Sequence, residues 1–160
     1  MPQEDVLNIL ADPLAQALLN STLPVRLAYT GLDGFPRVVP VWFYWDGEQI
    51  VIGTHANAPK VEALKKNPKV ALTIDKDTYP PEILLIRGTA SVELVDEVVP
   101  EYLAAGRKYL DAEQAQGFEA YAREAYKHMA RISITPEWAK ILDFQTRFPR
   151  AIEEQQRGSA

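Results

Sequence analysis

One short segment of the sequence combines residue types that bind an anion. It runs from Thr54 to Lys60 as Thr-His-Ala-Asn-Ala-Pro-Lys, and Pro59 suits the first position of a helix, where its missing N–H is not needed. The unpaired N–H groups that follow, together with the helix dipole, attract negative charge. A lysine such as Lys60 is unfavourable in the first turn of a helix, because the helix dipole is positive there. A bound anion would remove this conflict, and the Thr54 hydroxyl could reach the same anion. The segment alone fits a phosphate site and an ordinary surface lysine equally well.

Few other side chains in the sequence could do chemistry. The chain has no cysteine, which excludes disulfides, thiolate metal sites, iron–sulfur clusters and cysteine nucleophiles. Its two histidines, His55 and His128, are too few for a multi-histidine metal site within one chain. His55 follows Thr54 directly and could line a pocket there, although a single loop histidine is more often solvated. The sequence contains no glycine-rich nucleotide loop and no G-x-S-x-G elbow.

The elements around this segment read mainly as strands. Six runs are rich in β-branched and aromatic residues: Val25–Thr30, Arg37–Trp45, Glu48–Thr54, Lys69–Asp75, Ile83–Leu94 and Met129–Thr135. The segment Trp138–Phe144 follows the last of them. Asp33-Gly34 and Asp46-Gly47 separate the first three runs and are typical of hairpin turns. We therefore expect a three-strand antiparallel meander at the start. Six strands with this many turns suit a closed antiparallel barrel, which leaves no free sheet edge.

Helical patterns occupy the remaining segments. Apolar residues recur at helical spacing over Asp5–Leu19, where Asp12-Pro13 should break the helix, over Pro59–Lys66, from about Asp96 to Leu110 and from about Glu113 to Lys127. With 160 residues, the chain is sized for one domain. We expect that domain to span residues 1–160, with a helical segment at about 5–19, the barrel at about 25–142 and an exposed tail from about 150.

The run Val38–Trp45 is apolar on both alternating faces. A strand with one face in water would alternate polar and apolar residues. A helix, a second subunit or a flat aromatic ligand should therefore cover its outer face. Pro40 has no N–H to donate, which puts it at a bulge or at an open edge of the sheet.

Composition excludes several classes of protein. The formal net charge of −5 argues against nucleic-acid binding, which favours a basic surface. No apolar stretch approaches the roughly 20 residues that cross a bilayer. The acidic first residues are unlike a secretory signal. A soluble, cytoplasmic protein with no nucleic-acid or membrane partner is expected.

Three segments, taken in order, resemble one known family. They are Thr54-x-x-x-x-x-Lys60-x-x-x-Leu64-x-x-Asn67-Pro68-x-Val70, Gly34-x-Pro36-Arg37-Val38-Val39-Pro40-Val41-Trp42, and Arg87-Gly88-Thr89-Ala90. Together they look like the cofactor-binding segments of the pyridoxamine-phosphate-oxidase-like family of FMN-binding split barrels. The similarity runs continuously over roughly residues 20–95 and is fainter over 132–142.

This resemblance implies a mainly β protein with helices, a six-stranded antiparallel split β-barrel, acting as a homodimer with FMN at the dimer interface. In the matching positions Val39, Pro40 and Val41 would line the isoalloxazine ring, and Thr54 and Lys60 would bind the phosphate. The other candidate cofactor-binding residues are Arg37, Trp42, His55 and Pro59. Arg37 could reach the phosphate from its strand, or could equally be a solvent-exposed charge.

The sequence also departs from the true oxidases of that family. They carry Ser-Arg where this chain has Ala58-Pro59, and a lysine where it has Trp42. Fewer cations around the phosphate argue against oxidation of pyridoxamine phosphate itself. The pattern looks more like the branch that binds FMN or the 8-hydroxy-5-deazaflavin coenzyme, in which the cofactor transfers hydride to or from a small organic substrate. A non-catalytic flavin carrier is an alternative, as is a haem-binding relative that would need His55 or His128 as its axial ligand.

Overall fold

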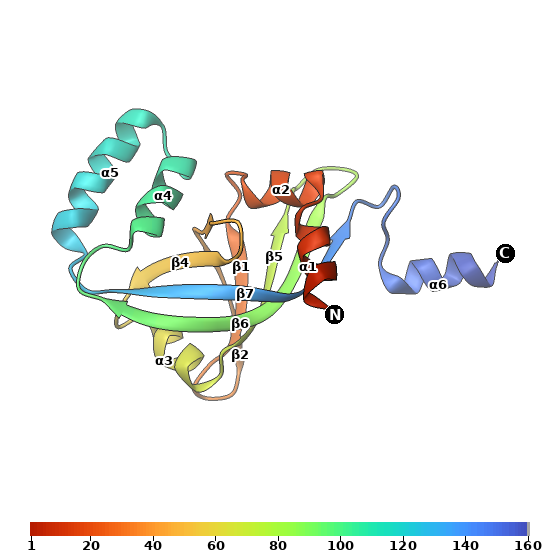
Figure 1. The fold of residues 1–160 in the computed structure, drawn as a ribbon, viewed down its shortest axis with the longest axis horizontal. Coiled ribbons are helices and arrows are strands. Elements are labelled where there is room, and N and C mark those ends of the chain that lie inside the picture. The colour runs from red at the N-terminus through yellow and green to blue at the C-terminus, as the bar shows by residue number, and fades with distance from the viewer. Residues whose placement is uncertain (160) are drawn as a thin grey trace.

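The computed structural model describes residues 1–159 and is built around one antiparallel sheet of seven strands (Figure 1). Their order across the sheet is β2-β1-β5-β6-β7-β4-β3. The strands are β1 (Val25–Thr30), β2 (Pro36–Val41), β3 (Tyr44–Trp45), β4 (Ile50–His55), β5 (Lys69–Asp75), β6 (Ile83–Val95) and β7 (Met129–Leu142). The mainly β class with helices is confirmed, and the long β6 and β7 cross the whole molecule side by side (Figure 1).

The expected strand 37–45 is broken into two pieces, and this corrects two predictions. β2 pairs with β1, while β3 pairs with β4 at the opposite edge of the sheet. The first strands therefore do not form a three-strand meander, and the sheet has seven strands instead of six. Its hydrogen-bonded order is open between β2 and β3, so it is a split barrel and not a closed one. The chain crosses this opening through Trp42 and Phe43.

Burial of aromatic side chains explains the break. Phe43 is 1 % exposed in the main core, and Trp42 packs against rings from two helices. Holding both inside the protein turns the chain from one sheet edge to the other. The expectation that Pro40 lies at an open edge is confirmed, because β2 is an edge strand. A proline there interrupts no ladder on its outer side.

Six helices accompany the sheet within residues 1–159, and all but the last pack against it or against each other. They are α1 (Gln3–Leu10), α2 (Pro13–Leu19), α3 (Pro59–Lys66), α4 (Pro100–Tyr109), α5 (Ala112–Ala125) and α6 (Arg150–Gly158). The predicted break at Asp12-Pro13 is confirmed, and the Asp12 side chain caps α2 by accepting from the Leu14 N–H at 2.8 Å. No helix in residues 1–159 is long and apolar enough to cross a membrane.

The apolar residues form two separate clusters. The larger one fills the space between the sheet and α1, α2 and α3, with Leu27, Ile50 and Leu64 among its buried members. The smaller one, which includes Val99 and Leu103, lies under the α4–α5 pair beside β4 and β7. Figure 1 shows α4 and α5 at one end of the molecule and α6 at the other.

The two faces of the Val38–Trp45 run have different surroundings. Val39 and Val41 point toward the main cluster, whereas Val38 is 66 % exposed and Pro40 is exposed too. Helices α4 and α5 cover Trp42. Helices thus cover the run at Trp42, as predicted, whereas the outer face of β2 is exposed to solvent in the single chain.

Candidate functional site

The amine of Lys60 and the hydroxyl of Thr54 lie together where β4 leads into α3. The Lys60 Nζ is 3.4 Å from the Thr54 Oγ1, to which it donates. Thr54 stands near the end of β4, and Lys60 is the second residue of α3. Burial lowers the pKa of the Lys60 amine, because a low-dielectric surrounding disfavours the charged form. Lys60 makes no ion pair with any residue from 1 to 159, so its charge is available for an anion.

The start of α3 has no side-chain cap. Pro59 occupies its first position, as the sequence predicted, and the preceding Ala58 cannot accept a hydrogen bond through its side chain. Helix starts usually satisfy one of their free N–H groups with a Ser, Thr, Asp or Asn cap. The absence of one here leaves the N-terminal end of α3 open to an external acceptor.

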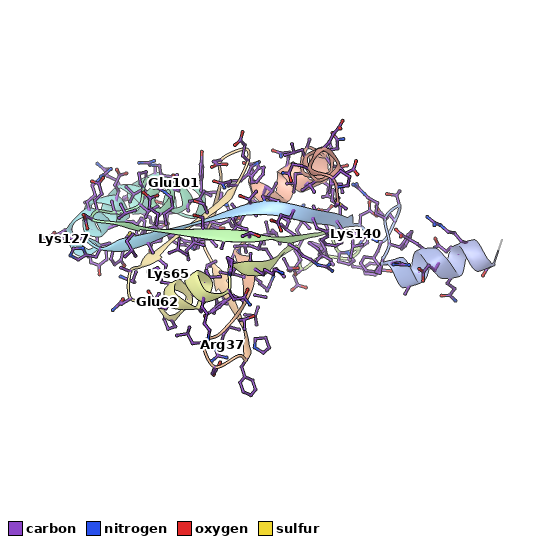
Figure 2. The ribbon with its side chains drawn as sticks, turned by 60° about the horizontal axis from the view of Figure 1, so that its bottom comes forward. Arg37, Glu62, Lys65, Glu101, Lys127 and Lys140 are labelled. Atoms are coloured by element: carbon purple, nitrogen blue, oxygen red, sulfur yellow. The ribbon has the colours of Figure 1, made fainter. Side chains whose placement is uncertain are left out.

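A groove of about 340 Å³ lies beside this helix start. Its walls are the turn between β1 and β2 on one side and the α3 entry on the other. The lining residues are Tyr29, Gly31, Leu32, Asp33, Arg37, Ala56, Asn57, Ala58, Pro59, Glu62 and Ala63. Figure 2 shows Arg37 on the same side of the molecule as α3, which carries the labelled Glu62 and Lys65. The structure thus brings Arg37 and Pro59 into one groove, and Thr54 with Lys60 lies just outside its lining.

Arg37 braces its own turn in this structure. Its Nη2 donates to the Asp33 Oδ2 at 2.7 Å, and its Nη1 donates to the Phe35 carbonyl at 3.3 Å. The Arg37 guanidinium holds the pKa of the Asp33 carboxyl below its ordinary value. Both partners are exposed, and exposed ion pairs are weak. Arg37 can therefore leave Asp33 for a stronger anion at modest cost.

A ligand at the edge of β2 would contact mainly the backbone of this strand. Val39 and Val41 are half-buried against the core, and β2 pairs through one edge only. Val38, which points outward, pairs with Ala28 of β1. Ala28 pairs with Ala71 of β5, and Ala71 with Arg87 of β6, so these residues form one row across the sheet. This row crosses the outer face of the sheet and meets Trp138 on β7, whose ring centroid is 4.3 Å from the Arg87 guanidinium carbon.

Trp42 and His55 contact aromatic residues of the α4–α5 end. The Trp42 ring stacks on Tyr109, with centroids 5.1 Å apart and planes 10° apart, and meets Phe118 edge-on at 5.6 Å. The His55 ring meets Tyr126 edge-on at 4.7 Å. Both candidate site residues thus help to fasten this helical pair to the strands. Sequence reasoning missed the cluster, because its members lie far apart along the chain.

A half-buried lysine with an enclosed amine, Lys108, is the other feature that sequence reasoning missed. The Lys108 Nζ is enclosed and has no hydrogen-bond partner in residues 1–159. It lies 3.5 Å from the ring centroid of Phe43 and 4.7 Å from that of Tyr109, a cation–π arrangement. Burial lowers the pKa of Lys108 to about 8. Nothing in its local sequence distinguishes it from the exposed lysines.

Metal chemistry has no support in the described part of the chain. Residues 1–159 contain no group of three or more His, Cys, Asp or Glu side chains that could hold a metal ion. His128 is largely exposed, and its Nδ1 is 3.9 Å from an Asp96 carboxylate oxygen.

The family model described as pyridoxamine 5'-phosphate oxidase matches residues 11–142. The chain therefore belongs to the pyridoxamine 5'-phosphate oxidase family of split barrels, as the resemblance in three segments predicted. No curated protein matches the sequence.

Solved structures agree with this assignment. An F420 reductase has 26 % sequence identity and a TM-score of 0.59, over 78 % of this chain and 94 % of its own. A protein from Listeria innocua described as a pyridoxamine 5'-phosphate oxidase has 22 % identity and a TM-score of 0.53, over 89 % and 99 % of the two chains. The haem storage protein of Vibrio cholerae has 16 % identity and a TM-score of 0.58, over 82 % and 93 %. The last two similarities establish the fold alone.

Proposed function

We propose that this chain binds FMN or a deazaflavin coenzyme through its phosphate and acts as a homodimeric oxidoreductase on a small organic substrate. The observation that carries the proposal is the Lys60–Thr54 pair, with its 3.4 Å contact, beside an α3 start that has no side-chain cap. A phosphate placed there would receive a charge-assisted hydrogen bond from the amine, a second from the hydroxyl, and free backbone N–H groups.

The chain's residues divide the binding task in two. Lys60 and Thr54 would hold the phosphate, joined by Arg37 when it leaves Asp33, while the free edge of β2 would lie along the ring at Val39–Val41. The cofactor supplies hydride transfer when bound, and the protein supplies position and electrostatics. No side chain at the β2 edge is placed as an obvious acid or base, which fits this division.

The deazaflavin coenzyme is the specific alternative to FMN. The F420 reductase that is 26 % identical to this chain over 94 % of its own length supports it. Ala58 and Trp42 replace a polar and a cationic residue of the true oxidases. These replacements argue against pyridoxamine phosphate as the substrate, and they are compatible with either cofactor. Both cofactors present a related ring and a phosphate, so the site geometry accommodates either.

The open outer face of the sheet supports the proposed dimer. Leu32, Phe35 and Val38, at and beside the β1–β2 turn, are 56 %, 69 % and 66 % exposed, and the neighbouring Ala28 and Ala71 leave the face flat. Clustered apolar residues in water are typical of an interaction surface. A second copy meeting this face would cover it and would enclose a cofactor lying on β2.

A side-by-side fluorescence titration tests the proposal. The purified protein is titrated with FMN, riboflavin and the deazaflavin coenzyme under one set of conditions. Tight binding of FMN or of the deazaflavin coenzyme, with much weaker binding of riboflavin, would support a phosphate-anchored site and select the reductase assay to run next. If none of the three bound, the flavin proposal would fail and haem binding would be tested instead.

A further inference from the structure

An aromatic cluster joins the crossing between β2 and β3 to the α4–α5 pair, which stands at one end of the molecule (Figure 1). Its rings are those of Trp42, Tyr102, Tyr109, Tyr121, Tyr126, Phe118 and His55. In a chain without cysteine, tryptophan and tyrosine are the side chains that most readily give up a single electron. Rings of these two types can pass an electron along a row when neighbouring rings are in contact.

Four of these rings form an unbroken row that ends at the surface. The ring centroids of Trp42 and Tyr102 are 6.2 Å apart, those of Tyr102 and Tyr126 are 5.9 Å apart, and those of Tyr126 and Tyr121 are 5.8 Å apart. The first three side chains are half-buried, whereas Tyr121 is 61 % exposed. Each step of the row therefore joins two neighbouring rings, and the last ring opens to solvent.

The hydroxyls of the three tyrosines in this row lie close enough to influence one another. Burial raises the pKa of Tyr102 to about 12, and the neighbouring Tyr126 and Tyr121 add to the rise. Tyr102 therefore keeps its proton at neutral pH. An oxidised phenol is a very strong acid, and its positive charge would be poorly solvated in this half-buried place. Each transfer from a tyrosine of the row therefore moves one electron and one proton.

The other two rings that contact Trp42 do not continue the row. Phe118 meets it edge-on at 5.6 Å, but phenylalanine does not readily lose an electron. Tyr109 stacks on it at 5.1 Å, and the Tyr109 hydroxyl donates to the Leu23 carbonyl at 2.6 Å. A backbone carbonyl is too weak a base to take the proton of an oxidised phenol. An electron that replaces one lost from Trp42 therefore comes from Tyr102.

We propose that this row is a one-electron relay, which carries an oxidising equivalent from Trp42 to the surface at Tyr121. A radical oxidant such as the azide or carbonate radical takes one electron from Trp42, and the indole N–H proton passes to water. Each following ring then restores the ring before it with one electron and one proton. The net change is a reduced oxidant, one proton in water and a phenoxyl radical at Tyr121.

The relay ends where a small reductant can reach it. A thiol in solution gives one hydrogen atom to the exposed Tyr121 radical, which restores the tyrosine and leaves a thiyl radical in solution. The half-buried rings, and Trp42 directly after β2, are then spared permanent oxidation. This inference concerns side chains of the chain itself and does not depend on the cofactor of the proposed function.

Trapping of the tyrosine radicals shows where the oxidising equivalent arrives. The purified protein is oxidised with radiolytically generated azide radicals, which attack tryptophan preferentially, in the presence of a nitroso spin trap. Mass spectrometry then measures the label on each tyrosine. Tyr79 is the internal reference, because it is 97 % exposed and is not a member of the cluster. We expect more label on Tyr121 than on Tyr79, although Tyr121 is the less exposed of the two. Equal label on both, or less on Tyr121, overturns the relay.

Conservative variants interrupt the row without removing its rings. Tyr102→Phe and Trp42→Phe each keep an aromatic ring in place that cannot pass the electron. Either change should bring the label on Tyr121 down to that on Tyr79 or below it. Trp138→Phe is the control, because it removes a tryptophan whose ring contacts Arg87 outside the cluster, and it should leave the ratio of the two labels unchanged. The wild-type ratio in Tyr102→Phe would contradict the relay.

Time-resolved absorption of the wild-type protein gives a measure that needs no variant. After a pulse of azide radicals, the tyrosine radical signal should grow as the tryptophan radical signal decays. Because the transfer occurs within one chain, its rate should not depend on protein concentration. Growth that accelerates in proportion to protein concentration would mean transfer between molecules and would exclude the relay.

Discussion

Lys60 and Lys108 are the two lysines in residues 1–159 whose amines burial makes clearly less basic. Their surroundings differ in one respect that decides what each can do. The Lys60 amine meets a hydroxyl at an open helix start, whereas the Lys108 amine is enclosed by aromatic rings with no acceptor. The first can receive an anion from solvent, and the second can only contribute to packing. Three predictions at the residue scale rest on this contrast.

Lys60→Ala should weaken FMN binding by about 10- to 100-fold, because a charge-assisted hydrogen bond contributes roughly 1.5–3 kcal/mol. Riboflavin, which has no phosphate, should bind the variant as it binds wild type. The measurement is fluorescence titration of both ligands. Lys65→Ala is the matched control, a lysine of the same helix that pairs with Glu62 at the surface. Equal losses for FMN and riboflavin would show that Lys60 does not hold the phosphate.

Lys108→Met should stabilise the protein at neutral pH. Methionine is similar in length to lysine and has no charge to bury. If this adds about 1 kcal/mol to the free energy of unfolding, the melting temperature should rise by roughly 2–4 °C. The measurement is thermal unfolding followed by circular dichroism. Lys127→Met, at an exposed lysine, should change little. A lower melting temperature at pH 7 would mean that the cation–π contact with Phe43 outweighs the burial of the charge.

The gain from Lys108→Met should also depend on pH. Burial lowers the pKa of Lys108 from 10.5 to about 8 in the folded protein, so the unfolded chain keeps this proton to higher pH. The free energy cost of burying the charged amine is therefore present in full below pH 8, and it disappears as the pH rises toward 10.5. The stability difference between the variant and wild type should be largest below pH 8 and shrink above it. A constant difference from pH 7 to 10 would contradict a buried charge.

At the scale of elements, small residues let the α4–α5 pair lie close to the sheet. A methyl group on Gly53 of β4 would come within 2.6 Å of the Tyr102 side chain on α4, and one on Gly106 within 2.7 Å of the Phe118 ring. Both rings belong to the aromatic cluster around Trp42. The tyrosine hydroxyl of Tyr109 then donates to the Leu23 carbonyl at 2.6 Å. These contacts hold the helical pair against β4, against Trp42 of the crossing between β2 and β3, and against the segment before β1.

Gly53→Ala should therefore push α4 away from β4 and destabilise the protein by about 1–3 kcal/mol, as overpacking does. Gly117→Ala is the opposite control. A methyl group there meets nothing within 4 Å on the exposed side of α5, so alanine should stabilise the helix by about 0.5–1 kcal/mol. Urea unfolding followed by tryptophan fluorescence measures both. If Gly53→Ala were as stable as wild type, the close approach of Tyr102 would not be required.

At the scale of the whole molecule, the open outer face of β2 should be the dimer contact. Val38→Asp places a charge in its centre, and burying an unpaired charge is costly. We expect the dimer dissociation constant to rise by more than about tenfold. FMN binding should weaken with it, because in the proposed dimer the cofactor site would be completed across the interface. Analytical ultracentrifugation measures the first effect. Leu94→Asp, at an apolar residue that is 59 % exposed near the far end of β6, should leave the dimer intact.

The sequence by itself determined the features that depend on chain neighbours. Turn residues predicted the strands, Asp12-Pro13 the helix break, and Pro59 with Lys60 the position of the helix start. The resemblance of three segments to a known family predicted the family, which the match over residues 11–142 confirms. The roles that this resemblance implies for Arg37, Thr54 and Lys60 stay predictions. These signals are local, because backbone preferences and capping act within a few residues.

Only the tertiary structure decided where the strand at 37–45 breaks and which groups are buried. Trp42 turns away from its expected strand because Tyr109 and Phe118, more than sixty residues later in the chain, supply its packing surface. Lys108 became distinct for the same reason, since Phe43 encloses its amine. The pattern of apolar and polar residues along a strand shows that one of its faces must be buried. It does not show which helix, subunit or ligand buries that face. The physical reason is that burial depends on all the residues around a side chain, and most of them are distant in sequence.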